Sequence, residues 1–291
     1  MRLIDSHAHM TSRTTDDYRE MRRSGIECVV EPSFWSGSDK LYPESFFDYF
    51  EHIHDFETER ADRIAGMDHY ITVSINPKEA VDREMSEAVI DRLPEYLDRD
   101  RVVGVGEIGF NLQTDEEEWA FREQLRVAEE HEAPVIIHLP HEEKPKGAVR
   151  TVDIIEEMGV TQERIIIDHN EPATMETTAA TDCWLGFTLY PGKISIEEVM
   201  PLLEEYGTDR RIINSSADWD DSDPLAVPKA RDAMIDAGWD RSEVRKLLFE
   251  NPLEFFAQSD SFDYAREIAA ESSTTESAAG AAETEPGTEA E

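Results

Sequence analysis

The chain opens with Met1-Arg2-Leu3-Ile4-Asp5-Ser6-His7-Ala8-His9-Met10, a short apolar run that ends in one acid and two imidazoles. Side chains at alternate positions of a β-strand point to the same face, so Asp5, His7 and His9 are expected to project together. Such a stretch is either the polar fringe of an ordinary strand or the first part of a metal site. The other motifs of the sequence distinguish between these two interpretations.

Short apolar runs like this first one recur along the chain and alternate with longer amphipathic segments. The strand candidates are 2–6, 27–31, 70–74, 102–107, 134–138, 164–168, 185–190 and 211–216, and helical patterns between them include 84–98, 115–132, 148–159, 194–206 and 228–237. Because no hairpin signals separate the runs, they indicate parallel strands joined by helical crossovers. Length and alternation predict an α/β fold, a (β/α)8 TIM barrel. A doubly wound open sheet is the alternative, since counting runs does not show closure.

The composition divides the chain into one domain and a tail. Residues 1–264 are predicted to form the single barrel domain. From Ala265 onward the chain is rich in Ala, Glu, Ser, Thr and Gly and almost lacks large apolar residues. Because such a segment buries too little apolar surface to offset its ordering entropy, 265–291 is predicted to be a disordered acidic tail.

The charge of the chain is extreme, with 66 acidic against 28 basic residues and a formal net charge of −38. Such a charge repels itself at low ionic strength and is screened within about 3 Å at molar salt. It therefore predicts a halophilic protein, with an acidic partner-binding surface as the alternative. An acidic surface also disfavours nucleic acid as a partner.

The cysteines and the hydropathy of the chain indicate its cellular compartment. Cys28 and Cys183 are far apart in apolar surroundings, which favours free thiols in a reducing environment over a disulfide. The chain has no apolar run of about 18 residues and no signal-peptide pattern at its start. We therefore expect a cytoplasmic protein that does not enter the membrane.

Several predicted strands end in a side chain that can bind a metal. In a (β/α)8 barrel the active site lies at the carboxyl ends of the strands. Taken singly, a histidine after an apolar run is usually structural, and a strand-terminal acid often caps the next helix. Six such groups at one end of a barrel indicate a metal centre instead: His7, His9, Glu107, His138, His169 and Asp218.

Each of these groups can be given a role. His7 and His9 would hold one divalent ion, with Asp5 orienting a ring from behind. Glu107 would bridge two ions through its two oxygens, and His138 and His169 would complete the second site. Asp218 would bind the first ion and accept the proton of a metal-activated water. The imidazole-rich set suits zinc or manganese better than magnesium.

These motifs resemble the TatD-type metal-dependent hydrolases, a branch of the amidohydrolase-like TIM barrels. The resemblance runs from Met1 to about Phe256 and rests on DSHAH (5–9), VGVGEIGFN (103–111), PVIIH (134–138), DHN (168–170), Asp218 and ENPLEFF (250–256). It implies the same six metal ligands, one or two divalent ions (Zn, Mn or Mg), and catalytic roles for Asp218 and Glu107.

The sequence departs from the nuclease members of that family. Asn76-Pro77 stands in place of a His-Pro pair, and His138-Leu139-Pro140-His141 lacks an arginine expected to bind phosphate. His169-Asn170 and Ser216-Ala217-Asp218 replace the HCF and ETD segments. TLYPGK (188–193) and 214–228 look closer to an archaeal-type subgroup.

Three functions follow as hypotheses. The first is hydrolysis of a phosphoester, with a deoxyribonuclease as one form of it. The second is hydrolysis of a small ester, lactone or cyclic amide at the same centre, and the third is a catalytically silent metal-binding barrel. Near the predicted mouth, Lys193 is either an anion contact or a solvated loop lysine. His141 either replaces the missing arginine as an anion contact or is an ordinary loop histidine. Trp35 and Tyr190 would form a stacking wall or pack the rim.

Overall fold

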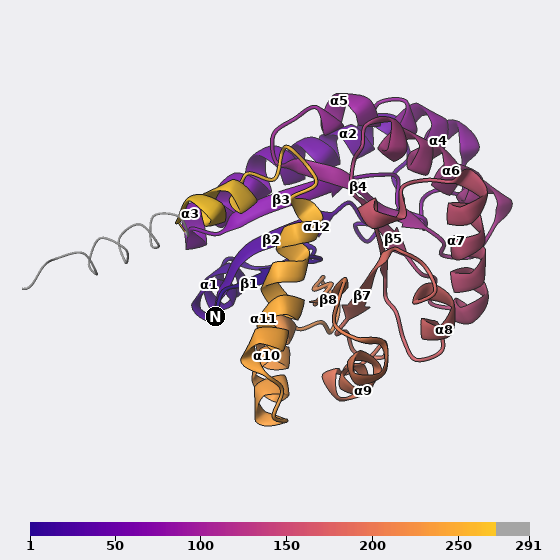
Figure 1. Ribbon diagram of the computed structural model, residues 1–291. Coiled ribbons are helices and arrows are strands. Elements are labelled where there is room, and N and C mark those ends of the chain that lie inside the picture. The colour runs from indigo at the N-terminus through magenta and orange to yellow at the C-terminus, as the bar shows by residue number, and fades with distance from the viewer. Residues whose placement is uncertain (272–291) are drawn as a thin grey trace, which may run out of the picture.

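The protein is a TIM barrel in the computed structural model, which describes residues 1–271. Eight strands pair in parallel in the order of the sequence, which confirms the predicted fold class (Figure 1). They are β1 (Leu3–Asp5), β2 (Ile26–Pro32), β3 (Asp68–Val73), β4 (Val102–Gly109), β5 (Val135–His138), β6 (Ile165–Asp168), β7 (Trp184–Thr188) and β8 (Arg211–Asn214). Each lies on a predicted apolar run.

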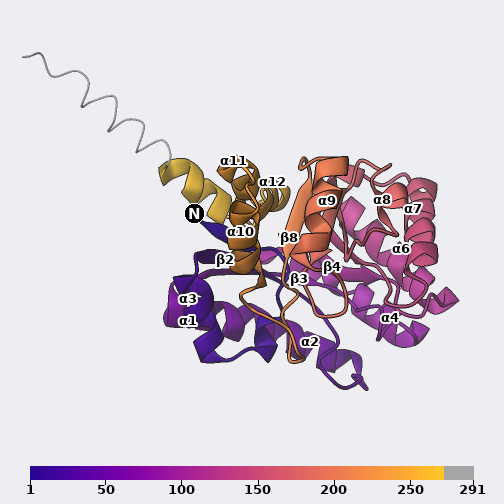
Figure 2. The same ribbon diagram turned by 90° about the horizontal axis from the view of Figure 1, so that it is seen from below.

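Helices connect consecutive strands and surround them in both views (Figures 1 and 2). The α-helices are α1 (Thr15–Arg23), α2 (Pro43–Glu51), α3 (Thr58–Ala65), α4 (Arg83–Ile90), α5 (Leu93–Leu97), α6 (Asp115–Glu130), α7 (Lys144–Met158), α8 (Met175–Thr178), α9 (Ile196–Tyr206), α10 (Ala226–Asp236), α11 (Arg241–Arg245) and α12 (Asn251–Phe256). The chain also forms short 3₁₀ and π segments, which are η1 (Met10–Ser12), η2 (His52–Glu57), η3 (Gln162–Arg164) and η4 (Lys246–Glu250). The predicted helix 84–98 is divided into α4 and α5, because Pro94 starts a new helix.

The barrel closes where β8 meets β1, although no ladder of the regular sheet joins them. Ala8 and Ala217 form an isolated parallel bridge, with hydrogen bonds from His9 N to Ala217 O (2.7 Å) and from Ser216 N to His7 O (2.7 Å). The buried carboxylate of Asp5 accepts from Ser215 N (3.1 Å) and Ser215 Oγ (2.5 Å). This seam favours the barrel over the open sheet and holds His7 and His9 at its upper end.

The interior of the barrel is built in layers. Every strand contributes to an apolar floor made of Ile4, Cys28, Val30, Tyr70, Val103, Ile136, Ile166, Trp184 and Ile212. Because alternate residues of a strand share a face, the positions two residues after Ile136, Ile166 and Ile212 stand one layer above this floor. Those positions are the polar residues His138, Asp168 and Asn214. The polar groups therefore meet at the carboxyl ends of the strands, on top of a dry base.

The carboxyl-terminal segment covers the bottom of the barrel. Phe255, Phe256, Phe262 and Tyr264 pack into the floor cluster, and Ala265 and Ile268 lie against it. Residues 264–271 are helical, and Arg2 pairs with Glu271 at 2.5 Å. The prediction of disorder from Ala265 is therefore wrong for 265–271, because apolar residues of this stretch contact the floor. The rest of the predicted tail, 272–291, lies outside the described residues.

Two further expectations concern the cysteines and the membrane. Cys28 and Cys183 are buried free thiols, as predicted. None of the helices within residues 1–271 has both the length and the apolar character needed to span a bilayer.

We predict that the Asp5–Ser215 contacts at the seam stabilise the whole fold. The substitution Asp5→Ala leaves two buried donors of Ser215 without an acceptor, so the free energy of unfolding should fall by about 3 kcal/mol. Urea unfolding of metal-free protein at constant salt measures this change. Asp5→Asn keeps an acceptor oxygen and should cost less. An alanine variant as stable as the unchanged protein would show that the backbone bridge alone closes the barrel.

Candidate metal centre

The carboxylate of Glu107, at the end of β4, lies at the middle of a group of histidines. Its Oε1 is 3.1 Å from His169 Nε2, 3.2 Å from His138 Nδ1 and 3.4 Å from His7 Nε2. Its Oε2 is 4.0 Å from His9 Nε2. Five of the six predicted ligands therefore meet at one point, although they come from four different strand ends.

These five residues divide into two groups of metal-competent atoms. His7, His9 and Glu107 form one group, and Glu107, His138 and His169 form the other, with the ligand atoms of each group within 4.8 Å of one another. Glu107 belongs to both groups, which is the position of a bridging carboxylate. The arrangement therefore offers two adjacent places for a divalent cation, each with two imidazoles and a shared acid.

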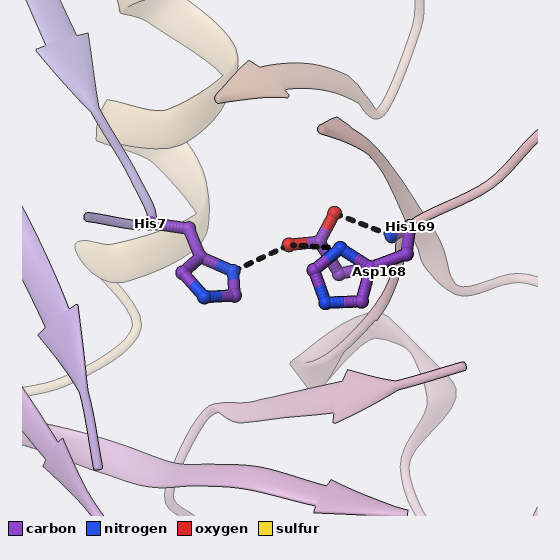
Figure 3. A group of neighbouring side chains, drawn as sticks. All are labelled: His7, Asp168 and His169. Atoms are coloured by element: carbon purple, nitrogen blue, oxygen red, sulfur yellow. Dashed lines mark hydrogen bonds and ion pairs between the residues drawn. The ribbon is translucent and has the colours of Figure 1, made fainter. Parts of the chain in front are cut away.

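Asp168 joins this centre as a buried partner of His7 (Figure 3). The Nδ1 of His7 lies 2.6 Å from Asp168 Oδ2, so it donates its proton there and leaves Nε2 facing His9 and Glu107. From the sequence, this orienting role was expected of Asp5. That assignment was wrong, because Asp5 bonds Ser215 and the backbone N of His7 at 3.4 Å rather than an imidazole ring.

Asp168 was missed because it was taken only as the end of a strand. Its signal was the alternation itself, since Asp168 pairs in register with His138 and follows Ile166 of the floor by two residues. Gly186 on β7 makes room for it, because a Cβ at that position would lie 2.2 Å from Asp168 Oδ1. Asn214 on β8 donates its Nδ2 to both Asp168 oxygens, at 3.1 and 3.0 Å.

His169 joins the same cluster of side chains as Asp168, although neighbouring residues on a strand point to opposite faces. The chain leaves β6 at this residue with φ of +64°, a left-handed conformation that carries a strain of about 1 kcal/mol for a non-glycine residue. The ring is then held by Thr188, whose Oγ1 lies 2.6 Å from His169 Nδ1. Strain at this position is offset by the contacts that fix the ring.

The hydrogen bonds of Thr188 determine which ring nitrogen of His169 carries the proton. The single hydroxyl proton of Thr188 goes to Asn214 Oδ1 (2.9 Å) or Asp168 Oδ1 (3.1 Å), since both atoms only accept. Thr188 therefore accepts from His169 Nδ1. The Nε2 of His169 presents a lone pair to Glu107 Oε1.

The electrostatics of the cluster fit a bound cation. Burial and Lys193 hold the pKa of His169 well below its ordinary value, and burial and His7 lower the pKa of His9 to about 3. Burial raises the pKa of Glu107, but His7, His138 and His169 outweigh it and hold that pKa well below its usual range. Burial lowers the pKa of His7, but Glu107 and Asp168 outweigh burial and raise that pKa above its ordinary value. A buried, ionised carboxylate among imidazole rings is an arrangement that a divalent cation stabilises.

Asp218, the sixth predicted ligand, lies on the wall of the same cavity but outside both groups of ligand atoms. It follows Ala217 of the seam, and its Oδ1 accepts from Tyr190 OH (2.9 Å) and from Asp220 N (2.9 Å). Within residues 1–271 no recorded hydrogen bond reaches its Oδ2. The carboxylate is therefore held at one oxygen and open at the other.

The cavity above the cluster has a volume of about 320 Å³. His9 stacks on Phe34 with ring centroids 3.7 Å apart, and Trp219 lies against both Phe34 (4.8 Å) and Trp35 (5.7 Å). Trp35, Tyr190, His141 and Lys193 all line this cavity, as their predicted place near the mouth requires. Burial lowers the pKa of His141 to about 4 and that of Lys193 to about 8.

Comparison with known proteins agrees with this geometry. Residues 4–257 match the family model described as TatD related DNase. The chain belongs to the TatD family. Since that family and the relative described next are hydrolases, this TatD-family protein is a metal-dependent hydrolase.

Two archaeal relatives extend over almost all of the barrel. An uncharacterized metal-dependent hydrolase of Methanocaldococcus jannaschii is 28% identical over 259 residues, which are 87% of this chain and 99% of the relative. The crystal structure of a TatD-like protein from Archaeoglobus fulgidus has a TM-score of 0.72 and 25% identity, and covers 87% of this chain and 99% of its own. An organophosphorus hydrolase variant from Deinococcus radiodurans shares the fold, with a TM-score of 0.64, 16% identity and coverage of 87% and 92%.

We predict that Asp168 controls the affinity of the centre for metal through His7. Asp168→Asn removes the negative charge that holds the His7 ring, so metal affinity should fall about 10- to 100-fold. Competition with a chromogenic chelator measures this affinity. Thr188→Ser keeps the hydroxyl next to Asp168 and serves as the matched control. Unchanged affinity in the Asp168→Asn protein would remove Asp168 from the centre.

Proposed function

We propose that this TatD-family protein hydrolyses a small phosphoester at a centre that holds divalent metal. The observation that carries the proposal is the pair of ligand groups, His7–His9–Glu107 and Glu107–His138–His169, that share one carboxylate. One ion would be held by the first group and a second by the other. Two imidazoles and one carboxylate in each group suit zinc or manganese better than magnesium.

A divalent cation in such a centre lowers the pKa of a water molecule and polarises the bond to be cleaved. Asp218 is the proposed general base, because its Oδ2 is open to the cavity while Tyr190 and the backbone of Asp220 hold Oδ1. Tyr190 donates to the carboxylate and so fixes its orientation at the cavity wall. Glu107 keeps the two ligand groups adjacent, and Asp168 fixes the orientation of the His7 ring through its hydrogen bond.

The dimensions and lining of the cavity favour a small substrate over DNA. A volume of about 320 Å³ lies at the lower end of the range for small-molecule sites. Within residues 1–271 no arginine lines the cavity, although the chain has 21 of them, and Asp218 and Asp220 stand at its wall. A DNA backbone needs a row of cationic contacts, and the two lysines of this wall, Lys78 and Lys193, do not form one in a chain with a net charge of −38.

A carboxylic ester or lactone is the second candidate. Phe34, Trp35 and Trp219 form an apolar wall that begins at His9 and reaches the surface, where Trp219 is 44% exposed. Such a wall suits the acyl or aryl part of an uncharged ester. It also suits the organic group of a phosphoester, so the wall alone does not distinguish a phosphoester from an uncharged ester.

A substrate panel tests the proposal. The manganese- or zinc-loaded protein is assayed in molar KCl with phosphomonoesters, phosphodiesters, carboxylic esters, lactones and single-stranded DNA. We expect turnover of small phosphoesters and none of DNA. Cleavage of DNA alone would identify a nuclease, cleavage of lactones alone would favour the second candidate, and no turnover at all would leave a silent metal-binding barrel.

Two variants serve as controls for this panel. The double substitution His7→Ala and His9→Ala should lose both bound metal and turnover. Asp218→Asn should keep its metal, because Asp218 lies outside the ligand groups, while kcat falls about 10²- to 10⁴-fold. Full turnover by either variant would contradict the role proposed for the residue concerned.

A further inference from the structure

The lysines of this chain differ in whether they have an acidic partner. The chain has seven lysines, and five of them lie within 4.0 Å of a carboxylate: Lys40, Lys144, Lys146, Lys229 and Lys246. Within residues 1–271 no such ion pair is recorded for Lys78 or Lys193. Both of these lysines line the cavity above the metal centre. In a chain with 66 acidic residues, the lysines without an acidic partner are thus gathered at one site.

Lys193 lies in this cavity next to His169. Its Nζ is 3.5 Å from His169 Nδ1 and 5.0 Å from the centre of the Tyr190 ring. The imidazole nitrogen cannot accept a hydrogen bond from it, because that nitrogen donates to Thr188. The ammonium group of Lys193 therefore lies next to the metal centre and donates no hydrogen bond to His169.

Lys78 lies at the mouth of the same cavity. Its Nζ is 3.6 Å from the centre of the Trp35 ring, a contact that positions the ammonium group without neutralising its charge. The loop that carries Lys78 is fixed to the centre, because Lys78 N donates to Asn76 Oδ1 and Asn76 Nδ2 lies 3.4 Å from Glu107 Oε2. The two charges thus belong to the built wall of the site.

We propose that Lys193 and Lys78 bind the anionic group of the substrate and so select a compact phosphate-bearing ester. Lys193 contacts the phosphoryl oxygens beside the metal centre, and Lys78 attracts the anion at the mouth. A lysine is a point charge with rotatable donors, which suits a phosphate group. An uncharged lactone would leave both ammonium groups unpaired, Lys193 in a half-buried position. The inference rests on the proposed function and names its substrate class.

Binding of inorganic phosphate tests this inference without turnover. Phosphate is titrated calorimetrically into the manganese-loaded protein at constant KCl, with the variants Lys193→Met, Lys78→Met and Lys146→Met. Lys146 is the matched control, because it carries the same charge on the surface, paired with Glu143. We expect about 10- to 100-fold weaker binding for Lys193→Met, a smaller loss for Lys78→Met and no change for Lys146→Met. Lys193→Arg should recover part of the affinity.

The outcomes separate this inference from the proposed function. Unchanged phosphate affinity in Lys193→Met, an equal loss in Lys146→Met, or no binding by the unchanged protein would overturn the inference. Metal content and the urea midpoint of each variant exclude misfolding as the cause of a loss. Lysine-dependent phosphate binding without turnover of any ester would leave the inference standing and reject the proposed hydrolysis of a phosphoester. Turnover of phosphoesters together with a phosphate affinity that is unchanged in Lys193→Met would support the proposed function and reject the inference.

Discussion

The site depends on one constraint, the convergence of four imidazoles on the buried carboxylate of Glu107. His7 and His169 direct their Nδ1 atoms away from the centre, towards Asp168 and Thr188, so their Nε2 atoms face the acid. A buried carboxylate needs positive charge beside it, which a proton on His7 or a bound cation supplies. The surrounding hydrogen bonds therefore preorganise the centre for metal before any metal binds.

The fold makes this convergence possible by separating an apolar floor from a polar layer. The floor takes one or more residues from each strand and is covered from below by Phe255, Phe256 and Phe262. One layer higher, Asp168 and Asn214 bond to each other, and Gly186 leaves the space that the Asp168 carboxylate occupies. Side chains in this layer have few alternative positions, because a rigid base supports them. Precise placement of His7 follows from packing that starts far from the metal ligands.

Much of this could be predicted from the sequence, because strand alternation and strand-end chemistry are local signals. They gave eight strands, the barrel and five converging candidate ligands. The expectation that Asp5 projects together with His7 and His9 was wrong, because β1 ends at Asp5, whose carboxylate bonds Ser215, while His7 and His9 follow the strand and reach Glu107. The functions of Asp5 and Asp168 were not predictable in the same way, since they depend on contacts with Ser215 and His7 across the barrel. The helical stretch 265–271 was missed because its composition is polar, although Ala265 and Ile268 contact the floor.

If Glu107 and its four histidines hold divalent metal, anomalous diffraction from crystals grown with manganese, measured at the manganese absorption edge, will locate it. We expect a peak enclosed by His7, His9 and Glu107, with a second peak beside His138 and His169 at full occupancy. Manganese bound elsewhere in the protein, with no anomalous density among these five side chains, would show that they do not form a metal centre.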